Sequence, residues 1–207
     1  MAEKKERIFK IKEQVRNIYN ASKSFVILKA SKKYKLMNKQ LKERIMLSIT
    51  EVNGCSLCSY VHTRAALSSG MTRENIKMIL DGNHDKIPVE DAVAVMFSQD
   101  FAYSKENPSD ESINRLIEEY GIKKAELVIA ASNVITMTNG MGIGMGLFFN
   151  RLRFKRDKRS NIFSEIFNPL LTMVLFPILV LLNFVICMFN DLKLLSNKNV
   201  LIKEWKK

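Results

Sequence analysis

The chain has 207 residues, of which 33 are Lys or Arg and 21 are Asp or Glu, so its formal net charge is +12. This length accommodates one domain with a sizeable hydrophobic core. With 47% hydrophobic residues, four Pro and eight Gly, the composition excludes disordered and collagen-like chains. Three Cys are too few for a disulfide-stapled secreted scaffold.

The positive charge lies at the two ends of the sequence. Residues 1–42 carry a net charge of +10, residues 43–150 carry −5, and residues 151–207 carry +7. The start of the chain is charged and lacks the apolar region of a signal peptide, which predicts that the acidic middle is cytoplasmic. No nucleic-acid motif or interleaved aromatic platform accompanies the basic residues, so no nucleic-acid partner is expected.

Residues 1–36 are predicted to form a basic amphipathic N-terminal helix. Ile8, Ile11, Val15 and Ile18 recur at a spacing of three to four residues, with Lys and Arg between them. Two interpretations remain open for its basic face. It is either simply solvated, while the apolar face covers the core, or it contacts an anionic membrane surface.

Residues 37–150 are predicted to be one helical domain. The pattern indicates helices at about residues 38–52, 55–70, 72–80, 88–103, 109–121 and 123–150, and no alternating run demands a strand. The expected fold class is therefore all-α. Glycines at positions 140, 142, 144 and 146 weaken the last of these helices, so we expect them to allow close approach of another helix or subunit.

A basic linker at residues 151–160 leads to a hydrophobic C-terminal helix and a Lys-rich tail, residues 161–207. Residues 169–189 are apolar and uncharged, and as a helix they would span about 31 Å, the thickness of a bilayer core. We expect a membrane anchor whose N-terminal end is cytoplasmic. The alternatives are a helix buried in an oligomer or one lying in the membrane interface. Pro177 and Asn183 argue against a simple span.

Four residues form a pattern that can perform thiol chemistry: Glu43, Cys55, Cys58 and His62. If Cys55 opens a helix, the first-turn amides favour a thiolate. Cys55 and Cys58 then lie on one helix face, where their sulfurs can close a disulfide. His62 follows Cys58 by one turn and can accept a thiol proton, and Glu43 on the preceding helix can orient the imidazole.

This spacing resembles the alkylhydroperoxidase D-like group of the carboxymuconolactone decarboxylase superfamily, whose signature is a Glu, 11 residues, CxxC, three residues and a His. The resemblance implies an all-helical bundle over about residues 30–150, to which the C-terminal hydrophobic helix is an addition. It implies a thiol-dependent peroxidase or disulfide reductase in which Cys58 attacks a hydroperoxide, Cys55 resolves the sulfenic acid, and Glu43 with His62 relays protons. The expected partners are a hydroperoxide substrate, a dithiol or thiol-protein reductant, and further copies of the chain in a trimer or hexamer. No cofactor or metal is expected.

A non-catalytic, membrane-associated redox switch or zinc clip remains the alternative. The same four residues could bind zinc, but structural zinc sites ordinarily use two separated ligand pairs, and no second pair exists in the sequence. Glu51 competes with Glu43 as the carboxylate, or is a solvated charge at the end of its helix. Some relatives carry a His between the cysteines, where this chain has Leu57. His84 is expected in a loop, and Cys187 in the apolar run is expected to be inert, although its role is open.

Overall fold

The computed structural model describes residues 6–83 and 87–189, and within those ranges its regular secondary structure consists of helices alone. The predicted all-α class is confirmed. The elements in chain order are α1 (Ile11–Ser31), the short 3-10 helix η1 (Lys32–Tyr34), α2 (Lys39–Asn53), α3 (Ser56–Ser68), α4 (Arg73–Leu80), α5 (Val89–Tyr103), α6 (Asp110–Leu152) and α7 (Ile162–Phe189).

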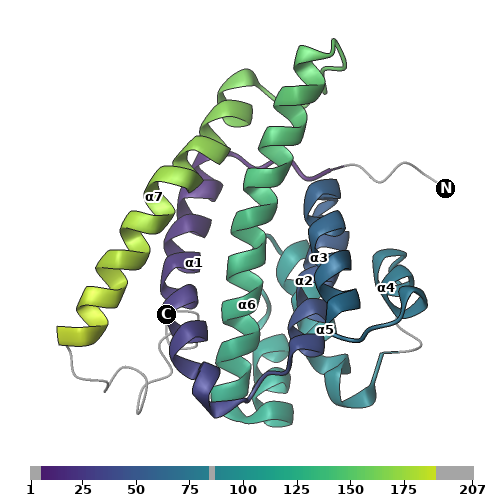
Figure 1. Ribbon diagram of the computed structural model, residues 1–207, viewed down its shortest axis with the longest axis vertical. Helices are drawn as coiled ribbons and strands as arrows, with labels where there is room; N and C mark the ends of the chain where they lie inside the picture. The colour runs from purple at the N-terminus through teal and green to yellow at the C-terminus, as the bar shows by residue number, and fades with distance from the viewer. Residues whose placement is uncertain (1–5, 84–86, 190–207) are drawn as a thin grey trace.

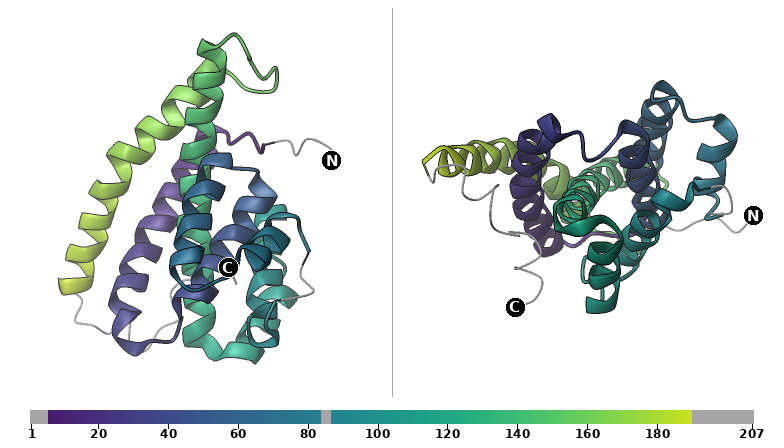
Figure 2. Two further views of the ribbon diagram at one scale, coloured as in Figure 1. Left: turned by 45° about the vertical axis from the view of Figure 1, so that its right-hand side comes forward. Right: turned by 90° about the horizontal axis from the view of Figure 1, so that it is seen from below.

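Helix α6 stands at the centre of the molecule. It packs against α1 and α7 on one side and against α2, α3 and α5 on the other, as Figures 1 and 2 show. Gly121 interrupts it with φ 69° and ψ 159°, so α6 is two helices joined at a kink. This interruption occurs at the glycine where the sequence predicts a helix end, because glycine adopts positive φ without steric penalty.

Side-chain caps fix several of the predicted helix starts. Asn38 accepts a hydrogen bond from the backbone of Leu41 at the start of α2, and Thr72 and Ser109 act in the same way for α4 and α6. Such caps typically stabilise a helix by about 1 kcal/mol. They explain why these boundaries could be predicted closely from local sequence.

The main hydrophobic core joins α2, α5 and α6. It contains Ile45 and Ile49 from α2, Phe97 and Phe101 from α5, and Ile129 from α6, each nearly inaccessible to solvent. Each large side chain contributes about 1.5–3 kcal/mol by leaving water. This packing holds α2, which carries Glu43, in a fixed position against the central helix.

The glycines of α6 admit close neighbours, as predicted. A Cβ atom on Gly140 would collide with the side chain of Gln14 on α1, and one on Gly144 would come within 3.0 Å of Pro169 on α7. A Cβ atom on Gly142 would meet the sulfurs of the two cysteines. Three of the four glycines therefore mark contacts, while Gly146 faces open space.

The N-terminal helix is shorter than the sequence pattern indicates. Helix α1 begins at Ile11, and the backbone of Lys10 donates a hydrogen bond of 2.9 Å to the Glu13 carboxylate. Residues 6–10, here called the N-terminal strap, are not helical. The apolar spacing that includes Ile8 was misleading because Ile8 packs against the cysteine region rather than along α1.

Helix α7 lies alongside α1 and α6 (Figure 1). One face is anchored by polar contacts: Asn183 donates to Ser22 Oγ at 3.0 Å, and Gln14 donates to Thr172 Oγ1 at 2.7 Å. Two described helices, α6 and α7, are long and apolar enough to cross a membrane by length and composition. The apolar window of α6 is 83% buried, as in a core helix, whereas that of α7 is 6% buried.

Candidate active site

The two cysteines lie at the turn between α2 and α3. Gly54 ends α2 in the left-handed conformation, with φ 74°, and redirects the chain so that Cys55 becomes the N-cap of α3. Cys58 lies in the first turn, and its backbone N–H donates to Cys55 Sγ at 3.3 Å. The two residues are joined by a disulfide, with their Cα atoms 5.3 Å apart.

Glu43 and His62 come together from α2 and α3. Oε2 of Glu43 lies 2.8 Å from Nδ1 of His62, and Glu43 is only 6% exposed. When the carboxylate is ionised it can only accept hydrogen bonds, and His62 then donates through Nδ1. In the neutral imidazole that tautomer leaves Nε2 as the basic nitrogen. The second carboxylate oxygen of Glu43 lies 3.5 Å from Nζ of Lys42.

Helix α6 forms the wall behind the sulfurs. Cys58 Sγ lies 3.7 Å from the backbone oxygen of Thr138 in α6. A Cβ atom on Gly142 would lie 2.9 Å from Cys55 Sγ and 3.1 Å from Cys58 Sγ. Glycine at this position therefore makes room for both sulfurs against the central helix.

The N-terminal strap covers the disulfide. Ile8 and Phe9 pack with the two cysteines and with Ile143 and Leu147 of α6 in a separate apolar cluster. As a result Cys55 is 1% exposed and Cys58 is 7% exposed. In the described conformation, neither sulfur is open to a bulky reactant.

Polar contacts from distant parts of the chain hold the strap in place. The backbone of Arg7 donates to Asn53 O at 2.9 Å, and its guanidinium pairs with the buried carboxylate of Glu106 at 2.5 Å. Asn168 of α7 donates to the carbonyl of Phe9 at 2.8 Å. The strap is therefore fastened to three elements besides the helix that follows it.

Glu6, the first residue of the strap, has a shifted pKa. Burial, together with repulsion from Asp157, raises the pKa of Glu6, while the nearby Arg159 opposes this shift. Arg159 also donates to the backbone oxygen of Glu6 at 3.2 Å. The basic linker thus reaches back to the start of the strap.

Comparison with known proteins agrees with this geometry. Residues 29–84 match the carboxymuconolactone decarboxylase family, and this range contains Glu43, both cysteines and His62. This segment is therefore similar to the carboxymuconolactone decarboxylase family. The uncharacterised protein YdfG of Bacillus subtilis (strain 168) is 28% identical over 113 residues, which cover 53% of this chain and 76% of YdfG. No solved structure matches the chain.

The remaining residues that the sequence singles out do not belong to the Glu43–His62 and Cys55–Cys58 pairs. Glu51 is only 6% exposed, so its interpretation as a solvated charge is wrong; its Oε1 faces Gly82 rather than His62. Leu57 is 47% exposed at the start of α3. Cys187 is a partly exposed free thiol in α7. His84 lies outside the described residues.

The described ranges contain no cluster of three or more His, Cys, Asp or Glu side chains placed to hold a metal ion. Cys55 and Cys58 are bonded to each other. The geometry thus presents a redox pair beside a separate carboxylate–imidazole pair.

Sequence reasoning missed the strap and its fastening. The Arg7–Glu106 and Phe9–Asn168 contacts join residues 99 and 159 positions apart, and no local pattern reports such distances. One signal was available: Ile8 and Phe9 form an apolar pair inside an otherwise basic segment.

Proposed function

We propose that the chain is a thiol-dependent peroxidase or disulfide reductase that reduces hydroperoxides with electrons from an external dithiol. One observation carries this proposal: a closed Cys55–Cys58 pair opens α3, and Glu43 of α2 contacts His62 of the same α3. The match of residues 29–84 to the carboxymuconolactone decarboxylase family supports the proposal, because Glu43, Cys55, Cys58 and His62 all lie within the matched range.

In the proposed cycle, His62 accepts the thiol proton of reduced Cys58, while Glu43 holds the imidazole in the required orientation. The Cys58 thiolate attacks the terminal oxygen of the hydroperoxide, and the O–O bond breaks. The alkoxide takes a proton and leaves as the alcohol, and Cys58 becomes a sulfenic acid.

Cys55 then attacks the sulfur of Cys58. The new S–S bond forms as hydroxide leaves and is protonated to water. An external dithiol attacks this disulfide, becomes oxidised itself, and restores both thiols. The reductant is a dithiol or a thiol protein. The N-terminal strap must move during the cycle, because both sulfurs are nearly inaccessible beneath Phe9.

Substitution of each cysteine tests the assignment. Cys58→Ser should abolish hydroperoxide consumption in excess dithiol, since it removes the attacking thiol. Cys55→Ser should stop turnover after one equivalent and leave a sulfenic acid at Cys58, detectable by mass spectrometry after trapping. Cys187→Ser is the matched control and should retain the activity. Turnover by Cys58→Ser at the unsubstituted rate would rule out the proposed cycle.

The burial of both sulfurs favours a second candidate, a non-catalytic redox switch or zinc clip on a membrane. In that case the reduced chain reacts with peroxide no faster than a free thiol, or it binds one zinc per chain through Cys55. Measurement of single-turnover oxidation and zinc content on the same reduced sample separates the two functions.

We also propose that α7 anchors the protein to a membrane, which leaves the catalytic domain in the cytoplasm. The support is the low burial of its apolar side chains, including Leu181 and Val174, which are 64% and 50% exposed. Leu181→Lys should release the chain from membranes, because a lysine at the centre of a span costs about 2.5–3.5 kcal/mol. Sedimentation with vesicles measures this. Leu181→Ala is the control, and unchanged membrane binding by Leu181→Lys would contradict the anchor.

The trimer or hexamer expected from the family resemblance remains a proposal. Light scattering of the purified chain measures its mass in solution. A monomer would contradict it.

A further inference from the structure

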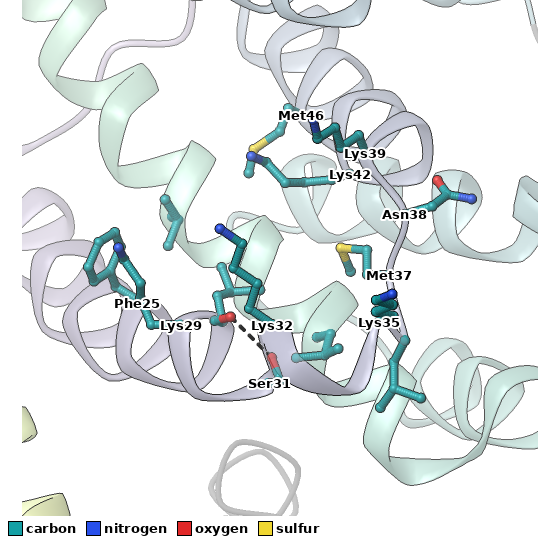
Figure 3. A pocket seen from close by; sticks show the side chains of 14 residues that line it. Phe25, Lys29, Ser31, Lys32, Lys35, Met37, Asn38, Lys39, Lys42 and Met46 are labelled. Carbon is teal, nitrogen blue, oxygen red and sulfur yellow. Dashed lines mark hydrogen bonds between the residues drawn. The ribbon is translucent and has the colours of Figure 1, made fainter. Parts of the chain in front are cut away.

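A cavity of about 440 Å³ lies where the end of α1, η1, the start of α2, and α6 meet (Figure 3). Its interior is apolar and is formed largely by Phe25, Met46, Leu127 and Val134. Concave sites of roughly 300–1,000 Å³ with apolar walls are typical of small-molecule binding. Its lining includes neither cysteine, nor Glu43 or His62, although Lys42 of the lining lies 3.5 Å from Glu43.

Lysines surround this apolar interior. Five of the fourteen lining side chains are lysines, and none is acidic. They are Lys29, Lys32, Lys35, Lys39 and Lys42. Figure 3 shows that Lys32 and Lys42 extend into the same space from opposite sides. Charges of one sign around a low-dielectric wall concentrate the field, so the cavity attracts anions.

The protein itself provides little counter-charge for these lysines. Within the described ranges, only Lys42 of the five has a carboxylate within ion-pair distance, that of Glu43. The two polar neutral residues of the lining already bond locally: Ser31 Oγ donates to Leu28 O, and Asn38 caps α2. The cluster therefore has unused capacity to bind a negative group.

The backbone at the rim is unusual as well. Lys35 has φ 51° and ψ 28°, a left-handed conformation at the end of η1. Residues other than glycine adopt this conformation infrequently, and such backbone strain is concentrated at ligand clamps and switches. The turn nevertheless places a lysine at the rim.

The apolar wall continues toward α7. Phe25 lines the cavity and also packs edge-on against Phe176 of α7, with ring centroids 5.7 Å apart. An apolar ligand chain in the cavity thus lies next to the exposed hydrophobic helix. The combination fits a molecule that has one anionic end and one hydrocarbon chain.

We propose that this cavity binds a single-chain anionic amphiphile, with its carboxylate or phosphate among the lysines and its chain against Phe25, Met46 and Val134. The lysines supply charge complementarity, and the interior supplies apolar burial. Neither feature alone accounts for the site. A small inorganic anion would make no contact with the apolar side chains, and a neutral lipid would bring no negative charge to the lysines.

The test uses the full chain in a non-ionic detergent with a dodecanoic acid that carries a photoreactive diazirine at its chain end. We expect cross-links on peptides that contain Phe25, Met46 or Val134. Unlabelled dodecanoate should suppress them, whereas dodecyltrimethylammonium and inorganic phosphate at equal concentration should not. The double variant K32Q/K39Q should label about tenfold less, because two favourable charge contacts are lost.

The double variant K77Q/K123Q is the matched control, since both residues are exposed lysines outside the cavity. It should label like the unsubstituted chain. Equal loss in both double variants would show a general charge effect and overturn the proposal. Competition by phosphate would show that the cavity binds anions without regard to a hydrocarbon chain. Competition only by phosphatidylglycerol vesicles would show that this face contacts a membrane surface. Either result would also overturn the proposal.

Discussion

Gly142 is the residue on which the space for the two sulfurs depends. A methyl group there would press on both Cys55 and Cys58 at 2.9 and 3.1 Å, so α3 or α6 must shift. We expect Gly142→Ala to cost about 1–3 kcal/mol of unfolding free energy and to slow disulfide closure. Denaturant titration and the rate of thiol loss after peroxide addition measure the two effects.

The matched control for that change is Gly146→Ala, one turn further along α6. No atom lies within 4 Å of the Cβ it would add. Alanine in an open helical position should stabilise the chain by up to about 1 kcal/mol. If the two substitutions had the same effect, the sulfurs would not be packed against Gly142.

The Arg44–Asp91 pair is a buried charge pair in the core. Arg44 Nη1 lies 2.6 Å from Asp91 Oδ2, with both side chains about 5% exposed. Burial raises the pKa of Asp91, although the neighbouring Arg44 opposes the shift. Arg44→Met removes this opposing charge, so the pKa of Asp91 should rise further, and the variant should lose about 3–5 kcal/mol at neutral pH.

The sign of the pH effect follows from proton binding. When the folded pKa exceeds the unfolded pKa, the folded state takes up the proton first, so stability falls as pH rises through the folded pKa. The deficit of Arg44→Met should therefore be larger at pH 8 than at pH 5 in denaturant titrations. Adding Asp91→Asn should remove most of this pH dependence. A deficit independent of pH would mean that packing, not charge, is lost.

At the scale of elements, the N-terminal strap covers the disulfide, and we expect it to limit the access of reactants. Phe9→Ala removes the largest side chain covering the disulfide. The rate at which dithiothreitol reduces the disulfide should rise about tenfold if local opening becomes easier by about 1.4 kcal/mol. Val15→Ala on the exposed face of α1 is the control. An unchanged reduction rate in Phe9→Ala would show that the strap does not limit access.

At the scale of the whole molecule, local signals account for what could be predicted. Asn38, Thr72 and Gly121 mark helix ends because caps and positive φ are short-range requirements. The Glu43–His62 contact was also predictable, because its spacing places the two residues on consecutive helices. The position of Lys42 beside Glu43, and the cavity that Lys42 lines, could be seen only in the packed structure.

Long-range packing accounts for what could not be predicted. The fastening of the strap to Glu106 and Asn168 depends on how α6 and α7 return to the start of the chain. The polar face of α7 is a second example. Asn183 interrupts the apolar run in the sequence, yet it bonds to Ser22 on α1, and Thr172 bonds to Gln14.

The hydrogen bond from Asn168 to the carbonyl of Phe9 has a consequence for how the two halves of the molecule communicate. It ties the N-terminal strap, which covers the sulfurs, directly to α7, the helix that we propose as a membrane anchor. If α7 is drawn away from α1 into lipid, the cover loses one of its fastenings and the disulfide becomes easier to reach. The rate of disulfide reduction would then act as a gauge of lipid insertion, with the same chain faster in a bilayer than in a state where α7 stays docked.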